Sequence, residues 1–247
     1  MLLPFTKNKY YFKPGLFLTL TFISIIILFY SLGIWQLGRA DEKKVLAAQI
    51  EQRLSQQTMI INDSNIEQLI RPDIAHRTIT LNGKFDTREL FFIDNKKYNG
   101  RAGYHVITPF IIDNTQQTIL VNRGWVDSGG NRKVLPEVVT PSELIILEGR
   151  LSNPVTAHFR PGISQPAESL GGIWLYIDLK FFSSLSGTTV APYILLLNKE
   201  NQYGYVREWH EFKANTEMHV GYAIQWFAFA LFSLLAYLSI GIKKRLE

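Results

Sequence analysis

The 247-residue chain contains no cysteine. This absence excludes a disulfide framework, a thiolate zinc site, a catalytic thiol and copper delivery through a cysteine pair. The sequence also has no HExxH helix, no GxSxG nucleophile elbow, no P-loop and no GxGxxG. Acidic residues are scattered, without the close carboxylate pair between strands that acid–base chemistry favours. We therefore expect a protein that is not an enzyme.

Two segments of 23 residues, 15–37 and 220–242, contain no Asp, Glu, Lys or Arg. A helix of that length is roughly 35 Å long, which is enough to cross a hydrocarbon layer of about 30 Å. The sequence therefore predicts two transmembrane helices around a domain at residues 38–219, with tails at 1–14 and 243–247. A cleaved signal peptide is the alternative for the first segment. The segment is longer than the ~7–15 apolar residues typical of one, so we interpret it as an uncleaved anchor.

The domain at residues 38–219 has no excess charge. The two tails hold six of the 26 basic residues and one of the 21 acidic residues, which accounts for the whole formal net charge of +5. A neutral domain gives no indication of nucleic-acid binding. Basic residues beside a span favour the cytoplasmic side of a lipid bilayer. Because no Arg- and Ser-rich presequence is seen, we expect a bacterial inner membrane, with both termini cytoplasmic and the domain periplasmic.

Helical and strand patterns alternate within the domain. Good helix formers predict a helix over residues 40–57, and Asp63 or Ser64 is the expected cap of a short helix reaching Ile70. Asp113-Asn114 is typical of a hairpin turn. We therefore expect a β-rich α+β domain with mainly antiparallel strands, flanked by two transmembrane α-helices. A short helix is expected at residues 179–185, and strands at 78–85, 90–94, 104–112, 118–121, 144–151, 173–177 and 193–197.

His219 lies where the polar domain meets the second apolar segment. On a helix, His219, Tyr222, Ala223, Trp226 and Ala230 share one face. A porphyrin needs such a surface, because iron takes a neutral nitrogen and the macrocycle packs in low dielectric. A second interpretation stays open: Tyr and Trp are common at membrane interfaces, where a lone histidine can simply contact headgroups.

Two glutamines lie inside the apolar segments, Gln36 in the first and Gln225 in the second. If the two helices pair, these amides could hydrogen-bond to each other, and Gly33 and Gly221 would permit close approach. The alternative is that both amides reach lipid headgroups or water.

Five motifs follow one another along nearly the whole chain. Together they resemble the surfeit-locus-1 family of cytochrome oxidase assembly factors. Thr216-Glu217-Met218 departs from the Asn-rich residues that are common before the histidine of this family, which puts only the local electrostatics in doubt. The motifs are G-x-W-Q-x-x-R-x-x-x-K at residues 33–43, G-Y-x-V-x-T-P at 103–109, V-N-R-G-W-V at 121–126, W-x-x-x-D at 174–178 and H-x-x-Y-A-x-Q-W-F at 219–227.

The resemblance implies a chaperone-like, non-catalytic role in the maturation of haem–copper cytochrome c oxidase. It implies help in placing or stabilising haem a in the large catalytic subunit, with that subunit and the haem a synthesis machinery as partners and haem a as a transient cofactor. It also implies that His219 is the haem iron ligand. We take Tyr222, Trp226 and Arg123 as further haem contacts, and as structural or partner-facing residues Gly33, Trp35, Gln36, Arg39, Gly124, Trp125 and Gln225.

The segment Asn122-Arg123-Gly124-Trp125 has two interpretations. Arg123 could form bidentate bonds with a haem propionate or with a carboxylate of the domain. Alternatively, the segment is structural, with Gly124 at a bend and Trp125 in the core. We favour the structural interpretation. Arg39 and Lys43 follow the first apolar segment, where lipid phosphates and a partner protein are both candidate contacts.

Two other classes of function compete with oxidase assembly. One is a membrane-anchored periplasmic sensing or scaffolding module without a cofactor, in which His219 would be dispensable. The other is an anchored hydrolase or transferase, which would need a clustered acid–base or metal site that the sequence does not display.

Overall fold

The computed structural model describes residues 10–129, 134–154, 170–209 and 214–244. It contains two compact units, each described separately below. Residues 1–49 and 212–247 form the helical unit, and residues 50–211 form the β domain. Parts of both predicted tails, residues 1–9 and 245–247, lie outside the described residues.

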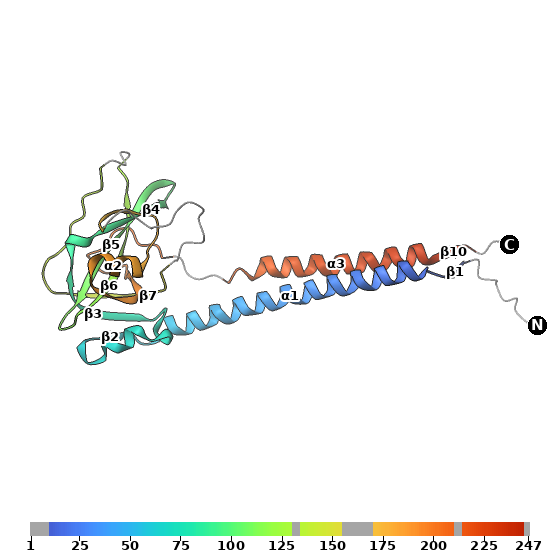
Figure 1. Ribbon diagram of the computed structural model, residues 1–247, viewed down its shortest axis with the longest axis horizontal. Coiled ribbons are helices and arrows are strands. Elements are labelled where there is room, and N and C mark those ends of the chain that lie inside the picture. The colour runs from blue at the N-terminus through green and yellow to red at the C-terminus, as the bar shows by residue number, and fades with distance from the viewer. Residues whose placement is uncertain (1–9, 130–133, 155–169, 210–213, 245–247) are drawn as a thin grey trace, which may run out of the picture. The chain divides into compact units, whose positions relative to one another are not determined.

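The helical unit consists of two long helices that lie side by side (Figure 1). They are α1, Leu16–Leu54, and α3, Thr216–Gly241, and both are long and apolar enough to cross a membrane. Near one end of the pair, the ring of Tyr237 stacks on Phe22 with 4.2 Å between ring centroids, and its hydroxyl lies 3.1 Å from Thr19 Oγ1. The two apolar segments predicted from the sequence therefore form one helical pair.

A short antiparallel ribbon joins the segments that flank these helices. β1, Tyr10–Phe12, pairs with β10, Ile242–Lys244, so that Tyr10 lies opposite Lys244. The backbone N–H of Lys13 also donates to the carbonyl of Gly241 at 2.9 Å. The inner ends of the predicted tails are thus hydrogen-bonded to each other.

α1 continues well past the first apolar segment. The helix predicted over residues 40–57 is confirmed as far as Leu54, and it continues the helix of the first apolar segment without a break. Residues 39–54 contain no Gly or Pro and are mostly strong helix formers, so nothing in the sequence ends the helix where the apolar residues end.

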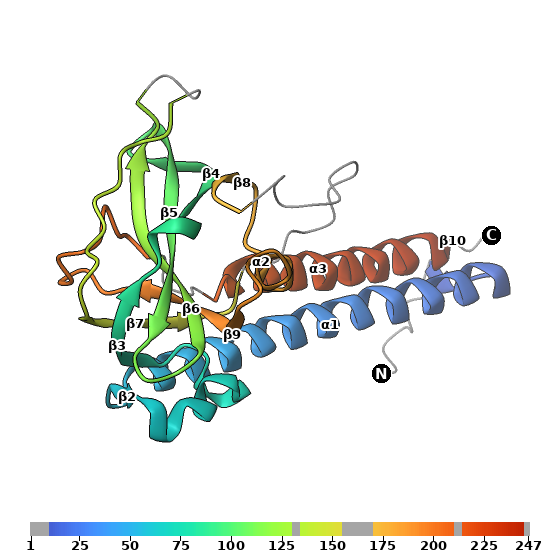
Figure 2. The same ribbon diagram turned by 60° about the vertical axis from the view of Figure 1, so that its left-hand side comes forward.

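The β domain is built around a ring of paired strands, seen from a second direction in Figure 2. β3 pairs with both β7 and β5, which closes the order β3-β7-β9-β6-β5 into a barrel. The bounds of these strands are β3 Thr78–Phe85, β5 Arg101–Ile112, β6 Gln117–Asp127, β7 Ile145–Ser152 and β9 Thr189–Leu197. The remaining elements are β2 Met59–Ile61, β4 Phe91–Tyr98, β8 Gly172–Trp174, α2 Leu179–Ser186 and the 3₁₀ helices η1 Asp63–Ile70, η2 Pro72–Ile74 and η3 Thr87–Glu89.

Most strand pairs of the barrel are antiparallel, as the sequence predicted. The expected hairpin is confirmed: β5 and β6 pair on either side of Asp113-Asn114, and Asn114 has a φ of 56°. The parallel pairs are β2–β3, β4–β8 and β6–β9. The expected cap at Asp63 or Ser64 is wrong, because the side chain of Asn62 accepts a hydrogen bond from the backbone N–H of Ser64 and caps η1.

The two faces of the strands carry separate cores. Ile79 and Leu81 of β3 are fully buried inside the barrel, as their alternation with polar residues predicts. On the other face, Trp174 of β8 stacks on Phe91 of β4 with 4.3 Å between ring centroids, and both belong to a cluster with Phe182 of α2. The barrel is thus packed on its inside and also beneath α2.

Candidate functional site

The two helices of the helical unit meet at a polar contact between Gln36 and His219. The amide Oε1 of Gln36, on α1, lies 2.8 Å from the imidazole Nδ1 of His219, on α3. Both side chains are half-buried. Gln36 lies near the end of the first apolar segment and His219 directly before the second, so the helical pair brings together residues 183 positions apart in the sequence.

Aromatic rings continue the helix contact next to this pair. Trp226 packs against Phe29 with 5.7 Å between ring centroids, and Phe227 packs against Tyr30 at 5.9 Å. Gly33 makes room for Phe227, because a Cβ at position 33 would lie only 2.5 Å from that ring. These contacts hold α1 and α3 close together on the same side as Gln36 and His219.

The predicted face of α3 does not offer one uniform surface. Ala223 is buried at 1% exposure and Trp226 packs on α1, whereas Tyr222 is 46% exposed. Of the residues of this face expected to contact a porphyrin, Tyr222 is exposed, and His219 and Trp226 are half-buried. The packing of Trp226 against Phe29 accounts for that side chain without a ligand.

Gln36 bonds to His219, so the suggested hydrogen bond between Gln36 and Gln225 is wrong. The side chain of Gln225 is exposed on α3. Trp35 is likewise 56% exposed. Arg39 forms an exposed ion pair with Glu42, one turn further along α1, at 2.5 Å.

Arg123 lies on β6 in the β domain and is 1% exposed. Its Nε donates to the carbonyl of Tyr203 at 2.7 Å, Nη1 to Thr140 Oγ1 at 2.6 Å, and Nη2 to the carbonyl of Val139 at 2.7 Å. The guanidinium also lies over the ring of Phe85, 4.8 Å from its centroid. Burial lowers the pKa of Arg123. Neither a carboxylate nor any other acidic partner of Arg123 occurs within the described residues, so the suggested ion pair with a domain carboxylate is not seen.

The two residues after Arg123 serve the fold of the β domain. Gly124 has a φ of +108°, and a Cβ there would lie 2.5 Å from the carbonyl oxygen of Val206. Trp125 is 8% exposed, and its Nε1 donates to the carbonyl of Lys96 at 3.3 Å. These contacts agree with the structural interpretation of the segment.

The model of the SURF1 family matches residues 23–231, which span the β domain and parts of both long helices. This chain belongs to the SURF1 (surfeit-locus-1) family.

This SURF1-family chain is similar to proteins of yeast, bacteria and nematodes over half or more of its length. It is 35% identical over 132 residues to the cytochrome oxidase assembly protein SHY1 of Saccharomyces cerevisiae, a match that covers 53% of this chain and 33% of that protein. It is 23% identical over 241 residues to a SURF1-like protein of Rickettsia felis, covering 91% of this chain and 95% of the relative. A SURF1-like protein of Caenorhabditis elegans is 25% identical over 254 residues, covering 94% of this chain and 76% of the relative. The chain thus spans about a third of the yeast protein and nearly all of the rickettsial one.

The ring nitrogens of His219 have the chemistry needed to hold a haem iron. An amide oxygen can only accept, so the contact with Gln36 assigns the proton of a neutral imidazole to Nδ1. Nε2 then carries the lone pair, and it has no hydrogen-bond partner among the residues that the structure describes. Haem iron accepts such a nitrogen from histidine.

The other described histidines of this SURF1-family protein have different surroundings. His105 Nδ1 lies 3.1 Å from Asn122 Nδ2, and its ring meets Trp209 edge-on. His76 has a φ of 68°, and burial lowers its pKa. Over residues 10–129, 134–154, 170–209 and 214–244, no group of three His, Cys, Asp or Glu residues is placed to hold a metal ion.

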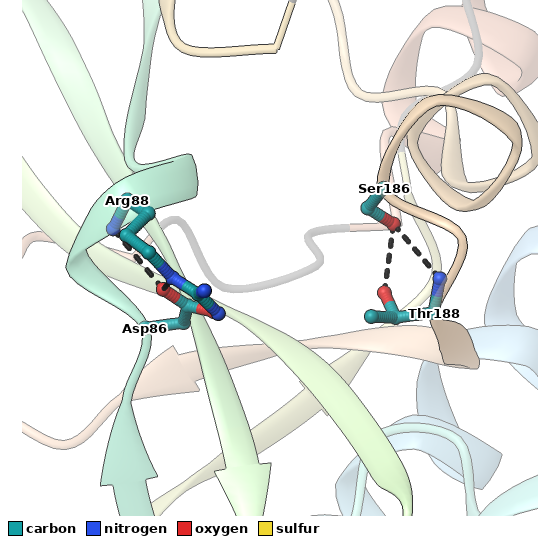
Figure 3. A network of polar contacts seen from close by, with 4 residues as sticks. All are labelled: Asp86, Arg88, Ser186 and Thr188. Atoms are coloured by element: carbon teal, nitrogen blue, oxygen red, sulfur yellow. Dashed lines mark hydrogen bonds and ion pairs between the residues drawn. The ribbon is translucent and has the colours of Figure 1, made fainter.

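Polar contacts within the β domain stabilise local turns. Figure 3 shows two of them, Asp86 with Arg88 before β4 and Ser186 with Thr188 at the end of α2. Arg88 Nη2 lies 2.6 Å from Asp86 Oδ2, and Ser186 Oγ lies 2.7 Å from Thr188 Oγ1. Each contact joins residues only two positions apart, so neither brings together functional groups from distant parts of the sequence.

Proposed function

We propose that this SURF1-family protein is an assembly factor for haem–copper cytochrome c oxidase, which helps to place or stabilise haem a in the large catalytic subunit. The observation that carries the proposal is the contact between His219 and Gln36, which leaves one imidazole nitrogen available beside an apolar helix surface. Family membership and the name of the yeast relative support the oxidase as the target. The large subunit and the haem a synthesis machinery are the corresponding partners.

In this proposal the residues of the helical unit bind and orient, and none of them acts as a catalyst. His219 would provide the nitrogen that holds the iron, and Tyr222 lies one turn further along the same helix with an exposed ring. If haem a binds there, a neutral nitrogen would hold its iron and apolar side chains would pack against its macrocycle. Arg123 has no place in this site, because its guanidinium is buried and already donates to three acceptors of the β domain.

The proposal places the protein in the inner membrane of a bacterium. The two apolar helices cross the bilayer, the basic tails remain in the cytoplasm and the β domain lies in the periplasm. Lys13 before the first apolar segment and Lys243 and Lys244 after the second lie at the same end of the helix pair, which supports this orientation. Fusing a reporter that is active only in the periplasm to the C-terminus tests it, since activity there would reverse the topology.

The role in assembly is tested by reduced-minus-oxidised spectra of membranes from cells that lack this gene and any second copy. We expect a weakened a-type haem band, restored by the parent sequence and not by His219→Ala. Restoration by both would keep the assembly role and remove His219 as the ligand. An unchanged band in the deletion strain would favour the sensing or scaffolding module instead.

A further inference from the structure

The hydrogen bond between Gln36 and His219 joins two helices and also orients the imidazole ring. Gln36 Oε1 and His219 Nδ1 are 2.8 Å apart, which is within the range of a well-formed hydrogen bond. Both side chains are half-buried, so water competes less for this bond than it would on an open surface. The imidazole is therefore held in one orientation by a residue on the other helix.

The geometry around the pair is set by close packing on the same side of the helices. Gly33 lies three residues before Gln36 and lets the ring of Phe227 approach α1 to a distance that a Cβ would block. Ala223 is buried one turn after His219. The polar bond thus lies next to a contact that tolerates little change in helix separation.

A hydrogen-bond acceptor on one imidazole nitrogen controls what the other nitrogen can do. In metal-bound histidines, the ring N–H that does not face the metal commonly donates to an oxygen. That bond fixes the tautomer and the ring orientation and raises the basicity of the ligating nitrogen. Gln36 has the corresponding place relative to His219, with Nδ1 as the donor and Nε2 as the remaining nitrogen.

We infer that Gln36 is a positioning residue for haem iron ligation by His219, and this inference rests on the proposed function. By accepting a hydrogen bond from Nδ1–H of His219, Gln36 selects the tautomer whose Nε2 lone pair is free for the iron. By its acceptor strength, it also sets how firmly that nitrogen binds. The helix pair is then part of the ligand site, because α1 supplies the acceptor and α3 supplies the histidine.

Gln225 provides a matched control for this inference. It is also a glutamine within an apolar helix, but its side chain is exposed. Among the described contacts it has no hydrogen bond to a histidine. Replacing Gln225 by Leu therefore removes the same chemical groups as Gln36→Leu, without touching the ring of His219.

The test uses the full chain, purified in detergent and titrated with haem a. Binding is followed by the Soret absorbance, and the iron–histidine stretching band is measured by resonance Raman spectroscopy of the reduced complex. We expect Gln36→Leu to weaken binding roughly 10-fold, as loss of an acceptor behind a ligating histidine typically does. Gln225→Leu should bind as the parent does.

The Raman band separates positioning from mere packing. Gln36→Leu should lower the frequency of the iron–histidine band, because Nε2 becomes a weaker donor. Gln36→Glu should raise it, because a carboxylate accepts a hydrogen bond more strongly than an amide. A substitution that only disturbed helix packing would not move the band in opposite directions. If Gln36→Leu fails to fold, the shift in Gln36→Glu decides.

The inference and the proposed function fail in different ways. If His219→Ala binds haem a as tightly as the parent, His219 is not the ligand and the proposed function loses its site. If His219→Ala loses binding while Gln36→Leu keeps the parental affinity and band position, the ligand remains and the role of Gln36 is overturned.

Discussion

At the scale of single residues, Gly124 and Trp125 both contact the backbone of Val206. The backbone N–H of Trp125 donates to the carbonyl of Val206 at 2.7 Å, and the N–H of Val206 donates back to Trp125 at 3.2 Å. Close approach of the two backbones requires that position 124 carry no side chain. The indole of Trp125 then lies over Gly103 and reaches the carbonyl of Lys96.

Replacing Trp125 by Ala should destabilise the β domain by about 3–5 kcal/mol, because a buried aromatic side chain would leave a cavity. The measurement is the urea midpoint of the full chain in detergent, read by pulse proteolysis. Val139→Ala is the matched control, since Val139 is 81% exposed and its loss should leave the midpoint unchanged. Equal midpoints for Trp125→Ala and the parent would contradict the assignment of Trp125 to the core.

Gly124 and Gly129 both have a positive φ, and substituting each by Ala separates backbone strain from a steric clash. Gly124→Ala should lower the free energy of unfolding by about 3 kcal/mol, because the new Cβ combines an unfavourable φ with contact on the Val206 carbonyl. Gly129→Ala should cost about 1 kcal/mol, because its φ is +68° and a Cβ there would meet no atom within 4 Å. Thermal unfolding of both variants checks this order, and a larger loss in Gly129→Ala would contradict it.

At the scale of elements, the turn before β4 depends on a carboxylate. Asp86 caps the 3₁₀ helix Thr87–Glu89, and its Oδ1 accepts from both the backbone N–H and the Nε of Arg88. The hydrogen bonds from the Arg88 side chain hold the pKa of Asp86 below its usual value. The folded state therefore binds this proton less readily than the unfolded state does.

This difference predicts how acid affects the β domain. Because the folded pKa of Asp86 is below the unfolded value of about 3.9, the free energy of unfolding should decrease as the pH falls from about 5 toward 3. Asp86→Asn should flatten this part of the pH profile. The effect is small, since the Arg88 side chain is 82% exposed.

Urea unfolding at several pH values measures the effect of Asp86. Arg88→Gln should flatten the profile in the same way, and the double variant should add nothing further. Parallel profiles for the parent and Asp86→Asn would show that this pair does not contribute to acid sensitivity.

Strands β3 and β7 could be predicted from the sequence because each of them alternates between a buried and a less buried face. In β3 the alternation is regular, with Ile79, Leu81 and Phe85 facing the core. The three-residue strands β1 and β10 gave no such signal, since all their residues are exposed and their pairing joins opposite ends of the chain. The continuity of α1 was not predicted, because the end of an apolar run marks where lipid exposure stops and not where a helix stops.

The candidate site could be predicted only in part, because its contacts depend on how the two helices pack. The position of His219 at the border of an apolar segment singled it out as a functional candidate. Its partner could not be read from one sequence, because the rotation of α1 relative to α3 decides whether Gln36 meets Gln225 or His219. Arg123 likewise suggested an acidic partner, but its environment depends on carbonyl groups that only the folded chain brings to it.

At the scale of the whole molecule, the chain combines an apolar helix pair with a separate β barrel. The helix pair holds His219 and its hydrogen-bond acceptor Gln36, while the segment around Arg123 is part of the packing of the barrel. In the proposed function, the residues that bind haem a lie on the helices. Haem content and barrel stability should then respond to different substitutions.

The most direct test of this account is the haem a content of the protein purified from membranes of cells that make haem a. It should be measured per polypeptide for the parent and for His219→Ala. We expect the parent to carry an a-type haem spectrum, and His219→Ala to lose most of it while the amount of protein in the membrane stays the same. Equal haem content in both would contradict ligation by His219. Loss of the protein together with the haem would contradict it as well, since His219 would then be required for folding.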